Sequence, residues 1–266
     1  MNWTPEQIVA RAAALDAAQR HARPVAALPP ADAPDLDAAY DIQAELRRLR
    51  GARGDARVGC KLAFTSAAMR DRMGIPEPAT GSLFASMRVA DGGLLARSAL
   101  IAPRLEAEIV FILRRPLVAG MSAAEALDAV EAVAPGIEII DGRHRDFRFE
   151  FHQAVADSAG AGAFVVGRAR ECNLTLGQPD LREMEVSLAI DGVVVASGST
   201  AAICDGPLAA PWVASQLASR IDLTAEAGAG LLLLGGSAID PVPLGAGRRV
   251  EVRIAGLGSV GFVVGD

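Results

Sequence analysis

Residues 105–113 read LEAEIVFIL, a short apolar run that contains two carboxylates. Runs of this length, rich in valine, isoleucine and leucine, are typical of buried β-strands. Successive side chains of a strand point to opposite faces, so Glu106 and Glu108 are expected on the same face. Two like charges side by side in an apolar strand repel each other, and a positive group should hold them if they are buried.

A divalent cation bound by hard oxygen ligands is one candidate for that positive group. Glu138, in the run GIEIID at residues 136–141, places a third carboxylate where a strand would otherwise be wholly apolar. No histidine or cysteine stands at ligand spacing, which favours Mg²⁺ or Mn²⁺ over zinc. The alternative is that Glu106 and Glu108 lie on a solvent-facing edge strand and pair with nearby arginines such as Arg104.

Lys61 is the single lysine among 26 basic residues. Its compact amine has a pKa that falls readily on burial, which makes it a candidate for chemistry. The alternative is that codon bias removed lysine from the chain and one survived by drift. It lies in the apolar run VGCKLAF at residues 58–64, so it should face either water or a site. Beside a metal, the cation and desolvation would lower its pKa and equip it for proton transfer. Without a metal, three carboxylates would hold it as an ion-paired ammonium.

Composition excludes several classes of protein. The 266 residues carry a formal net charge of -6 and no basic cluster interleaved with aromatics, which argues against nucleic acid or an anionic membrane as partner. The apolar runs are shorter than the roughly 20 residues needed to span a bilayer. Cys60, Cys172 and Cys204 show no close metal-type spacing and suit a reducing, cytoplasmic compartment.

Two helices are expected first, over residues 5–19, where TPEQ at residues 4–7 has the form of a capping box, and over 36–50. We therefore predict a helical region at 1–54 and a β-rich catalytic domain at 55–266. Further helices are expected at residues 66–72, 122–130 and 207–220. Strands are expected near residues 57–64, 105–113, 137–141, 163–166, 185–190, 193–197, 231–234, 249–254 and 258–264, with a hairpin turn at Asp191-Gly192.

Several segments together resemble a known family. They are GCKLAFTS at residues 59–66, PRLEAEIVF at 103–111, IEIIDGR at 137–143, VAD at 155–157 and GLGSV at 256–260. In this order and spacing they resemble the 2-hydroxypenta-2,4-dienoate (2-keto-4-pentenoate) hydratases and 4-oxalocrotonate decarboxylases of the fumarylacetoacetate hydrolase superfamily. The resemblance covers nearly the whole chain.

The resemblance implies an α+β fold with a mixed, rolled β-sheet core and an N-terminal helical region. It implies Mg²⁺ or Mn²⁺ held by Glu106, Glu108 and Glu138, with Lys61 as the acid/base group beside a small-molecule 2-oxo acid. It also implies oligomers, formed by this chain alone or with a related lyase subunit.

Three further residues are expected at the substrate. The resemblance implies that the backbone at Leu62 touches it, and it makes Ser237 a candidate for contact with its carboxylate. Asp157 is a third candidate, although it could equally cap a turn or hold Lys61. The three histidines of the chain are expected in surface or hydrogen-bonded roles.

The activity that the resemblance implies is hydration of a 2-hydroxy-2,4-dienoate to a 4-hydroxy-2-oxo acid in aromatic catabolism. One alternative is decarboxylation of a 4-oxalocrotonate-type 2-oxo acid. A carbon–carbon bond hydrolase would want a histidine–carboxylate pair to activate water, and no such pair is obvious. A non-catalytic paralogue that partners an active subunit is a further alternative, because Ala79 stands where many hydratases have aspartate.

Overall fold

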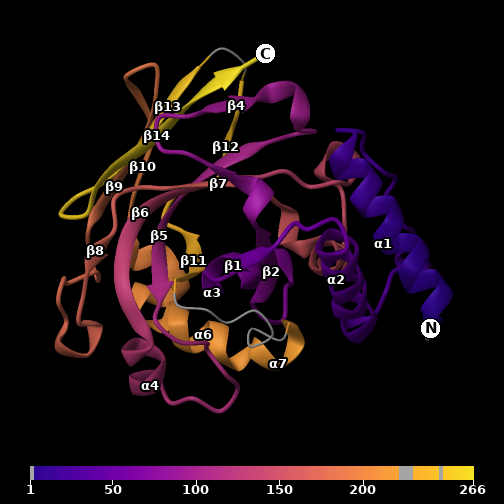
Figure 1. The fold of residues 1–266 in the computed structure, drawn as a ribbon, viewed down its shortest axis with the longest axis horizontal. Coiled ribbons are helices and arrows are strands. Elements are labelled where there is room, and N and C mark those ends of the chain that lie inside the picture. The colour runs from indigo at the N-terminus through magenta and orange to yellow at the C-terminus, as the bar shows by residue number, and fades with distance from the viewer. Residues whose placement is uncertain (1–2, 222–229, 246–247) are drawn as a thin grey trace.

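The computed structural model describes residues 3–221, 230–245 and 248–266, and its strands form two sheets (Figure 1). The larger sheet has the order β2-β1-β11-β5-β6-β7-β3, with β12 beside β5 and β8 beside β6. It is mixed, because β1 runs parallel to β11 and β3 parallel to β7 while the other pairs are antiparallel. Its strands are β1 (Arg57–Ala63), β2 (Ala79–Phe84), β3 (Arg88–Val89), β5 (Arg104–Leu113), β6 (Val130–Ile140), β7 (Ala161–Val166), β8 (Arg170–Glu171), β11 (Leu231–Ser237) and β12 (Val242–Pro243).

The smaller sheet has the order β10-β9-β13-β14-β4. Its strands are β4 (Leu94–Ala96), β9 (Glu185–Ile190), β10 (Val193–Ser199), β13 (Arg249–Ile254) and β14 (Gly258–Gly265). The helices are α1 (Pro5–Arg20), α2 (Leu36–Gly51), α3 (Ala67–Met73), α4 (Ala123–Asp128), α5 (Phe151–Ala156), α6 (Ala210–Gln216) and α7 (Ala218–Ile221). This is the α+β architecture with a curled, mixed sheet that the family resemblance implied.

Local signals placed several elements correctly. Thr4 caps α1 and Ser122 caps α4, each in a reciprocal capping box, as their sequence patterns predicted. The expected hairpin joins β9 to β10, and both turn residues, Asp191 and Gly192, have positive φ angles.

Other elements differ from the prediction. The strand expected at 137–141 is longer, because β6 already begins at Val130, directly after α4. This strand contains Pro135, and proline cannot donate to a ladder. On β6, the residues that pair with β8 end at Val133, and those that pair with β7 begin at Gly136. Pro135 lies between them, so its missing N–H interrupts neither of these two ladders.

Several elements were not predicted at all, among them the short strands β3, β4, β8 and β12 and two more elements near the site. One is β2, which is buried along its whole length, and the other is α5, a helix of six residues. The long helix expected at 207–220 is divided into the helices α6 and α7 after a 3-10 turn at Pro207–Ala209.

The face of β5 that carries Glu106 and Glu108 is the one that builds the site. Cross-strand register pairs Val110 with Ala134 and Glu106 with Glu138 on this face, and Val110 and Ala134 belong to a small core cluster. The opposite face of β5 belongs to the main core. The three carboxylates therefore lie on an inner face of the sheet, next to its apolar part at Val110 and Ala134.

The N-terminal helices lie to one side of the sheet, beside β1 and β2 (Figure 1). α2 packs against α1, α5 and β2. Its buried Gln43 donates hydrogen bonds to the carbonyl oxygens of Thr80 and Val155, at 2.8 and 2.6 Å. These contacts tie the helical region to strand β2, next to the site. Among the described residues, no helix has the length and apolar character needed to cross a membrane.

Candidate active site

Glu106, Glu108 and Glu138 converge on one point of the sheet. Glu106 and Glu138 face each other as a register pair between β5 and β6, and Glu108 follows two residues along β5. One carboxylate oxygen from each residue lies within 4.8 Å of those of the other two. Glu108 and Glu138 are fully buried, and Glu106 is half-buried. The edge-strand alternative is therefore wrong, because β5 is an interior strand of the sheet.

Burial and mutual repulsion disfavour the charged form of these carboxyl groups. Burial, followed by the charge of Glu138, raises the pKa of Glu106 to about 7. Burial and the charges of Glu138 and Glu106 raise the pKa of Glu108 well above its usual value. Raised carboxyl pKa values of this kind indicate that a bound cation would stabilise the ionised cluster.

Lys61 supplies one positive charge to this cluster. Its Nζ atom lies 3.0 Å from Glu138 Oε1, and the two side chains are 2% and 0% exposed. Burial favours the neutral amine, but the charges of Glu138, Glu106 and Glu108 outweigh it and raise the pKa of Lys61. The expectation of a lowered pKa assumed a bound cation, and in the protein without one the ion-paired ammonium prevails.

The donor set fits a divalent cation. Three carboxylates and one ammonium leave two uncompensated negative charges when all are ionised. Glu108 Oε1 and Glu138 Oε2 are buried and have no hydrogen-bond partner among the described residues. Buried polar atoms without partners are rare in native proteins and call for a ligand or water. Hard oxygen ligands of this kind suit Mg²⁺ or Mn²⁺.

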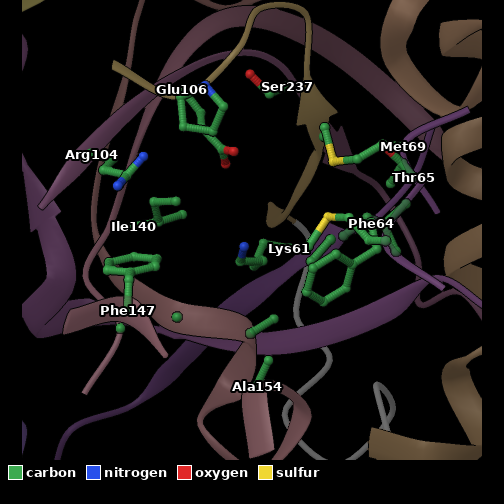
Figure 2. A pocket seen from close by; sticks show the side chains of 18 of the residues that line it. Lys61, Phe64, Thr65, Met69, Arg104, Glu106, Ile140, Phe147, Ala154 and Ser237 are labelled. Atoms are coloured by element: carbon green, nitrogen blue, oxygen red, sulfur yellow. The ribbon is translucent and has the colours of Figure 1, made fainter. Parts of the chain in front are cut away.

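A cavity of about 560 Å³ opens in front of this cluster. Lys61 and Glu106 line it, so the amine and one carboxylate face the open space (Figure 2). Much of the remaining wall is apolar or aromatic, and this part includes Phe64, Met69, Met73, Ile140, Phe147, Phe149 and Pro241. The cavity therefore combines a charged end with a wall suited to a short carbon chain.

Leu62 and Ser237, both expected near the substrate, also line this cavity. The Ser237 hydroxyl donates to Ile239 O at 2.7 Å and accepts from Ile239 N at 3.3 Å. A substrate carboxylate would have to compete for that hydroxyl proton. Contact of either residue with a substrate stays a prediction.

Asp157 lines the cavity as well, but its carboxylate is held by a neighbouring arginine. Asp157 Oδ1 lies 2.5 Å from Arg143 Nε, and Oδ2 accepts from the Arg143 backbone N–H at 2.8 Å. His144 Nδ1 is 3.7 Å from Oδ2, and the other ring nitrogen lies 2.9 Å from Arg11 Nη2. Asp157 thus holds Arg143, where the sequence had suggested Lys61 as one partner.

Gly236 holds one of the three metal-site carboxylates in place, and the sequence analysis did not identify this role. Its N–H donates to Glu108 Oε2 at 2.9 Å. Its φ angle is +107°, and a Cβ atom there would lie only 2.5 Å from Thr65 Oγ1. The pair Gly235-Gly236 after an apolar strand was the only sequence signal for this role.

Comparisons with known proteins show the family of the chain. The family profile described as fumarylacetoacetate (FAA) hydrolase C-terminal matches residues 69–264. A 4-oxalocrotonate decarboxylase from a Pseudomonas species is 37% identical, covering 87% of this chain and 88% of that protein. A 2-keto-4-pentenoate hydratase from Burkholderia vietnamiensis is 35% identical and covers 95% of each chain.

A solved structure extends the likeness to the whole fold. It is 4-oxalocrotonate decarboxylase from Pseudomonas putida G7, complexed with magnesium and adipate. It superposes with a TM-score of 0.91 at 32% identity and covers 99% of each chain. The family profile, together with the carboxylate cluster and the curled sheet, shows that the chain belongs to the fumarylacetoacetate hydrolase family.

Proposed function

We propose that this protein is a metal-dependent lyase that hydrates a 2-hydroxy-2,4-dienoate to a 4-hydroxy-2-oxo acid. The observation that carries the proposal is the cluster of three carboxylates, two of whose buried oxygens have no partner, beside a buried lysine at the end of an apolar cavity. The 2-keto-4-pentenoate hydratase relatives support this reaction.

Glu106, Glu108 and Glu138 would hold the metal. When bound, Mg²⁺ or Mn²⁺ supplies a Lewis acid that stabilises negative charge on the oxygens of a 2-oxo acid. Glu108 is kept in place by the Gly236 N–H. Glu138 is oriented by its ion pair with Lys61.

Lys61 is the group that moves protons. Hydration needs a proton transferred from the 2-hydroxyl group to the far carbon of the diene, followed by addition of water to the remaining conjugated double bond. The Nζ atom faces the cavity, and a bound cation would lower its pKa toward the range in which it can deliver a proton and take one back. Aromatic side chains such as Phe147 and Phe149 limit bulk water around the chain of the substrate.

Decarboxylation of a 4-oxalocrotonate-type acid is the second candidate. The 37% identity to a decarboxylase and the TM-score of 0.91 to another favour it. Loss of CO₂ would leave the electron pair of the broken C–C bond, which the conjugated 2-oxo group accepts as an enolate. Lys61 would then protonate that enolate.

One assay separates the two reactions. Purified protein with Mg²⁺ is offered 2-hydroxypentadienoate or 4-oxalocrotonate, absorbance is followed, and CO₂ release is measured in parallel. Hydration consumes the dienoate without CO₂, whereas decarboxylation releases one CO₂ per 4-oxalocrotonate. The absence of both activities would refute the lyase proposal.

The same assay addresses the paralogue alternative. Ala79 is fully buried at the start of β2, and the structure does not place it in the cavity wall. An active protein purified alone excludes a purely structural partner. A protein that gains activity only when a related lyase subunit is added supports one.

We also propose a cytoplasmic homo-oligomer. All three cysteines are free thiols, which supports a reducing compartment. Val193, Val194 and Val195 are 65%, 57% and 46% exposed on the edge strand β10, and such a row supports a subunit contact. Light scattering on the purified protein would give the subunit number.

A further inference from the structure

Arg104 lies on the same face of β5 as Glu106 and Glu108. The three residues follow one another at intervals of two, and Arg104 pairs in register with Ile140 as Glu106 does with Glu138. Arg104 lines the cavity, as Glu106 does, and in Figure 2 both side chains project into the same space. One interior strand thus carries an anionic group and a cationic group along one wall.

The charge of Arg104 is not used within the described part of the protein. No hydrogen bond or ion pair of its guanidinium is present there, and its one side-chain contact is a cation–π interaction, with Cζ 5.1 Å from the centre of the Phe147 ring. Half-buried and buried arginines elsewhere behave differently. Arg50 pairs with Asp55 at 2.7 Å, and Arg143 pairs with Asp157 at 2.5 Å.

The acidic groups of the cavity do not need Arg104. Glu106 belongs to the carboxylate cluster, whose charge Lys61 and a bound divalent cation would balance, and Asp157 is held by Arg143. Asp146, the other carboxylate in the wall, is exposed on a 3-10 turn. Arg72, the other arginine in the wall, is exposed near the end of α3. Arg104 is therefore a cation, partly shielded from water, that is available to an anion in the cavity.

The spacing along β5 sets the length of that anion. Two residues of a strand advance by about 6.6 Å. The two carboxyl carbons of an extended six-carbon diacid are joined by five C–C bonds of about 1.5 Å each, which span about 6 Å in a zigzag. A diacid held by its 2-oxo acid end at the carboxylate cluster would therefore bring its far carboxylate to the level of Arg104.

We propose that Arg104 binds the distal carboxylate of the substrate, and that the protein selects 2-oxo or 2-hydroxydienoic acids with a second carboxylate at the far end over monocarboxylates. This inference rests on the proposed function, because the first carboxylate is placed at the metal site. Phe147 holds the guanidinium plane, which leaves its N–H edge free to donate two parallel hydrogen bonds to a carboxylate.

The test compares two ligands that differ only at the far end. Binding of 2-oxoadipate and of 2-oxohexanoate to the Mg²⁺-loaded protein is measured by calorimetry. The wild-type protein should bind 2-oxoadipate about tenfold or more tightly, as expected for a charge-assisted contact. Arg104→Met should abolish this preference, and Arg104→Lys should keep part of it.

Arg72→Met is the matched control, because it removes the other arginine of the wall and should leave the preference intact. Mn²⁺ affinity without any ligand should not weaken in any variant, and thermal unfolding verifies that each is folded.

Two results would overturn the inference in different ways. If both acids bind with Mg²⁺ but the wild type shows no preference, or Arg104→Met retains it, Arg104 is not the anchor and the proposed function survives. If neither acid binds in the presence of Mg²⁺, the 2-oxo acid site itself is wrong and both proposals fall.

Discussion

Lys61 lies against Glu138 at 3.0 Å and faces the cavity, so it can act on a substrate without being a metal ligand. Lys61→Ala should lower kcat by about 10²- to 10⁴-fold, the range for loss of a general acid–base group. Mn²⁺ affinity should not weaken, because the substitution removes a positive charge from the cluster. Steady-state kinetics and Mn²⁺ titration of the same preparation measure both. Unchanged turnover would refute the role of Lys61.

Asp157 offers a second prediction, on stability. Burial raises the pKa of Asp157, but the charges and hydrogen bonds of Arg143 and His144 outweigh it and lower the pKa below the usual 3.8. A depressed pKa means that this group stabilises the fold above pH 3.8 and that the contribution is lost as the pH falls through the folded-state pKa. Asp157→Asn leaves Arg143 buried without its counter-ion and should cost about 3–5 kcal/mol in the free energy of unfolding.

Denaturant unfolding at neutral pH measures that loss. Asp180→Asn is the control, because it breaks an exposed ion pair with Arg182 and should leave the midpoint unchanged. Equal midpoints for wild type and Asp157→Asn would contradict the assignment.

Single residues of the site differ in how far sequence alone could reveal them. Lys61 stood out as the one lysine, and the spacing of Glu106 and Glu108 fixed their common face. Arg143 and Arg104 could not be distinguished from the other arginines, because their partners, or the lack of them, depend on contacts between distant segments.

At the scale of elements, the register shift between Leu234 and Ser237 in β11 positions Glu108 through the Gly236 N–H. Gly236→Ala combines a positive φ angle with a clash against Thr65, so it should lower stability by more than the roughly 1–2 kcal/mol of the backbone strain alone and should weaken Mn²⁺ binding. Gly177→Ala is the matched control, since Gly177 also has a positive φ angle but open space around it. Mn²⁺ titration should distinguish the two, and equal affinities would contradict the support role of Gly236.

Elements with a local signal were predictable, and those without one were not. Capping boxes and the Asp191-Gly192 turn depend on residues a few positions apart, so α1, α4 and the β9–β10 hairpin followed from the sequence. β2 has no alternation because it is buried on both faces. The proline in β6 is tolerated because it lies between the residues that pair with β7 and those that pair with β8.

At the scale of the whole molecule, the carboxylate cluster links stability to pH and metal. In the metal-free protein the pKa of Glu106 is raised from 4.5 to about 7, so the fold binds a proton that the unfolded chain releases earlier. That contribution to stability decreases as pH rises from 4.5 to about 7. Mn²⁺ replaces the proton, so it should raise the thermal midpoint more at about pH 8 than at about pH 5. An equal shift at both values would argue that these carboxyl groups do not bind the ion.

The fold class and family followed from the sequence over almost the whole chain, whereas the boundary between a region at 1–54 and a domain at 55–266 stays a prediction. Contacts such as Gln43 with Thr80 and Arg11 with His144 join the N-terminal helices closely to the β-rich part. These contacts join residues far apart in the sequence, so only the three-dimensional structure could show them.

The central claim is that Glu106, Glu108 and Glu138 bind one divalent cation. Calorimetric titration of the metal-free wild type and of Glu106→Gln with Mn²⁺ tests it most directly. We expect one equivalent of Mn²⁺ per chain in the wild type and at least about tenfold weaker binding in the variant, as for loss of a charged ligand. No stoichiometric binding in the wild type, or the same affinity in Glu106→Gln, would contradict the claim.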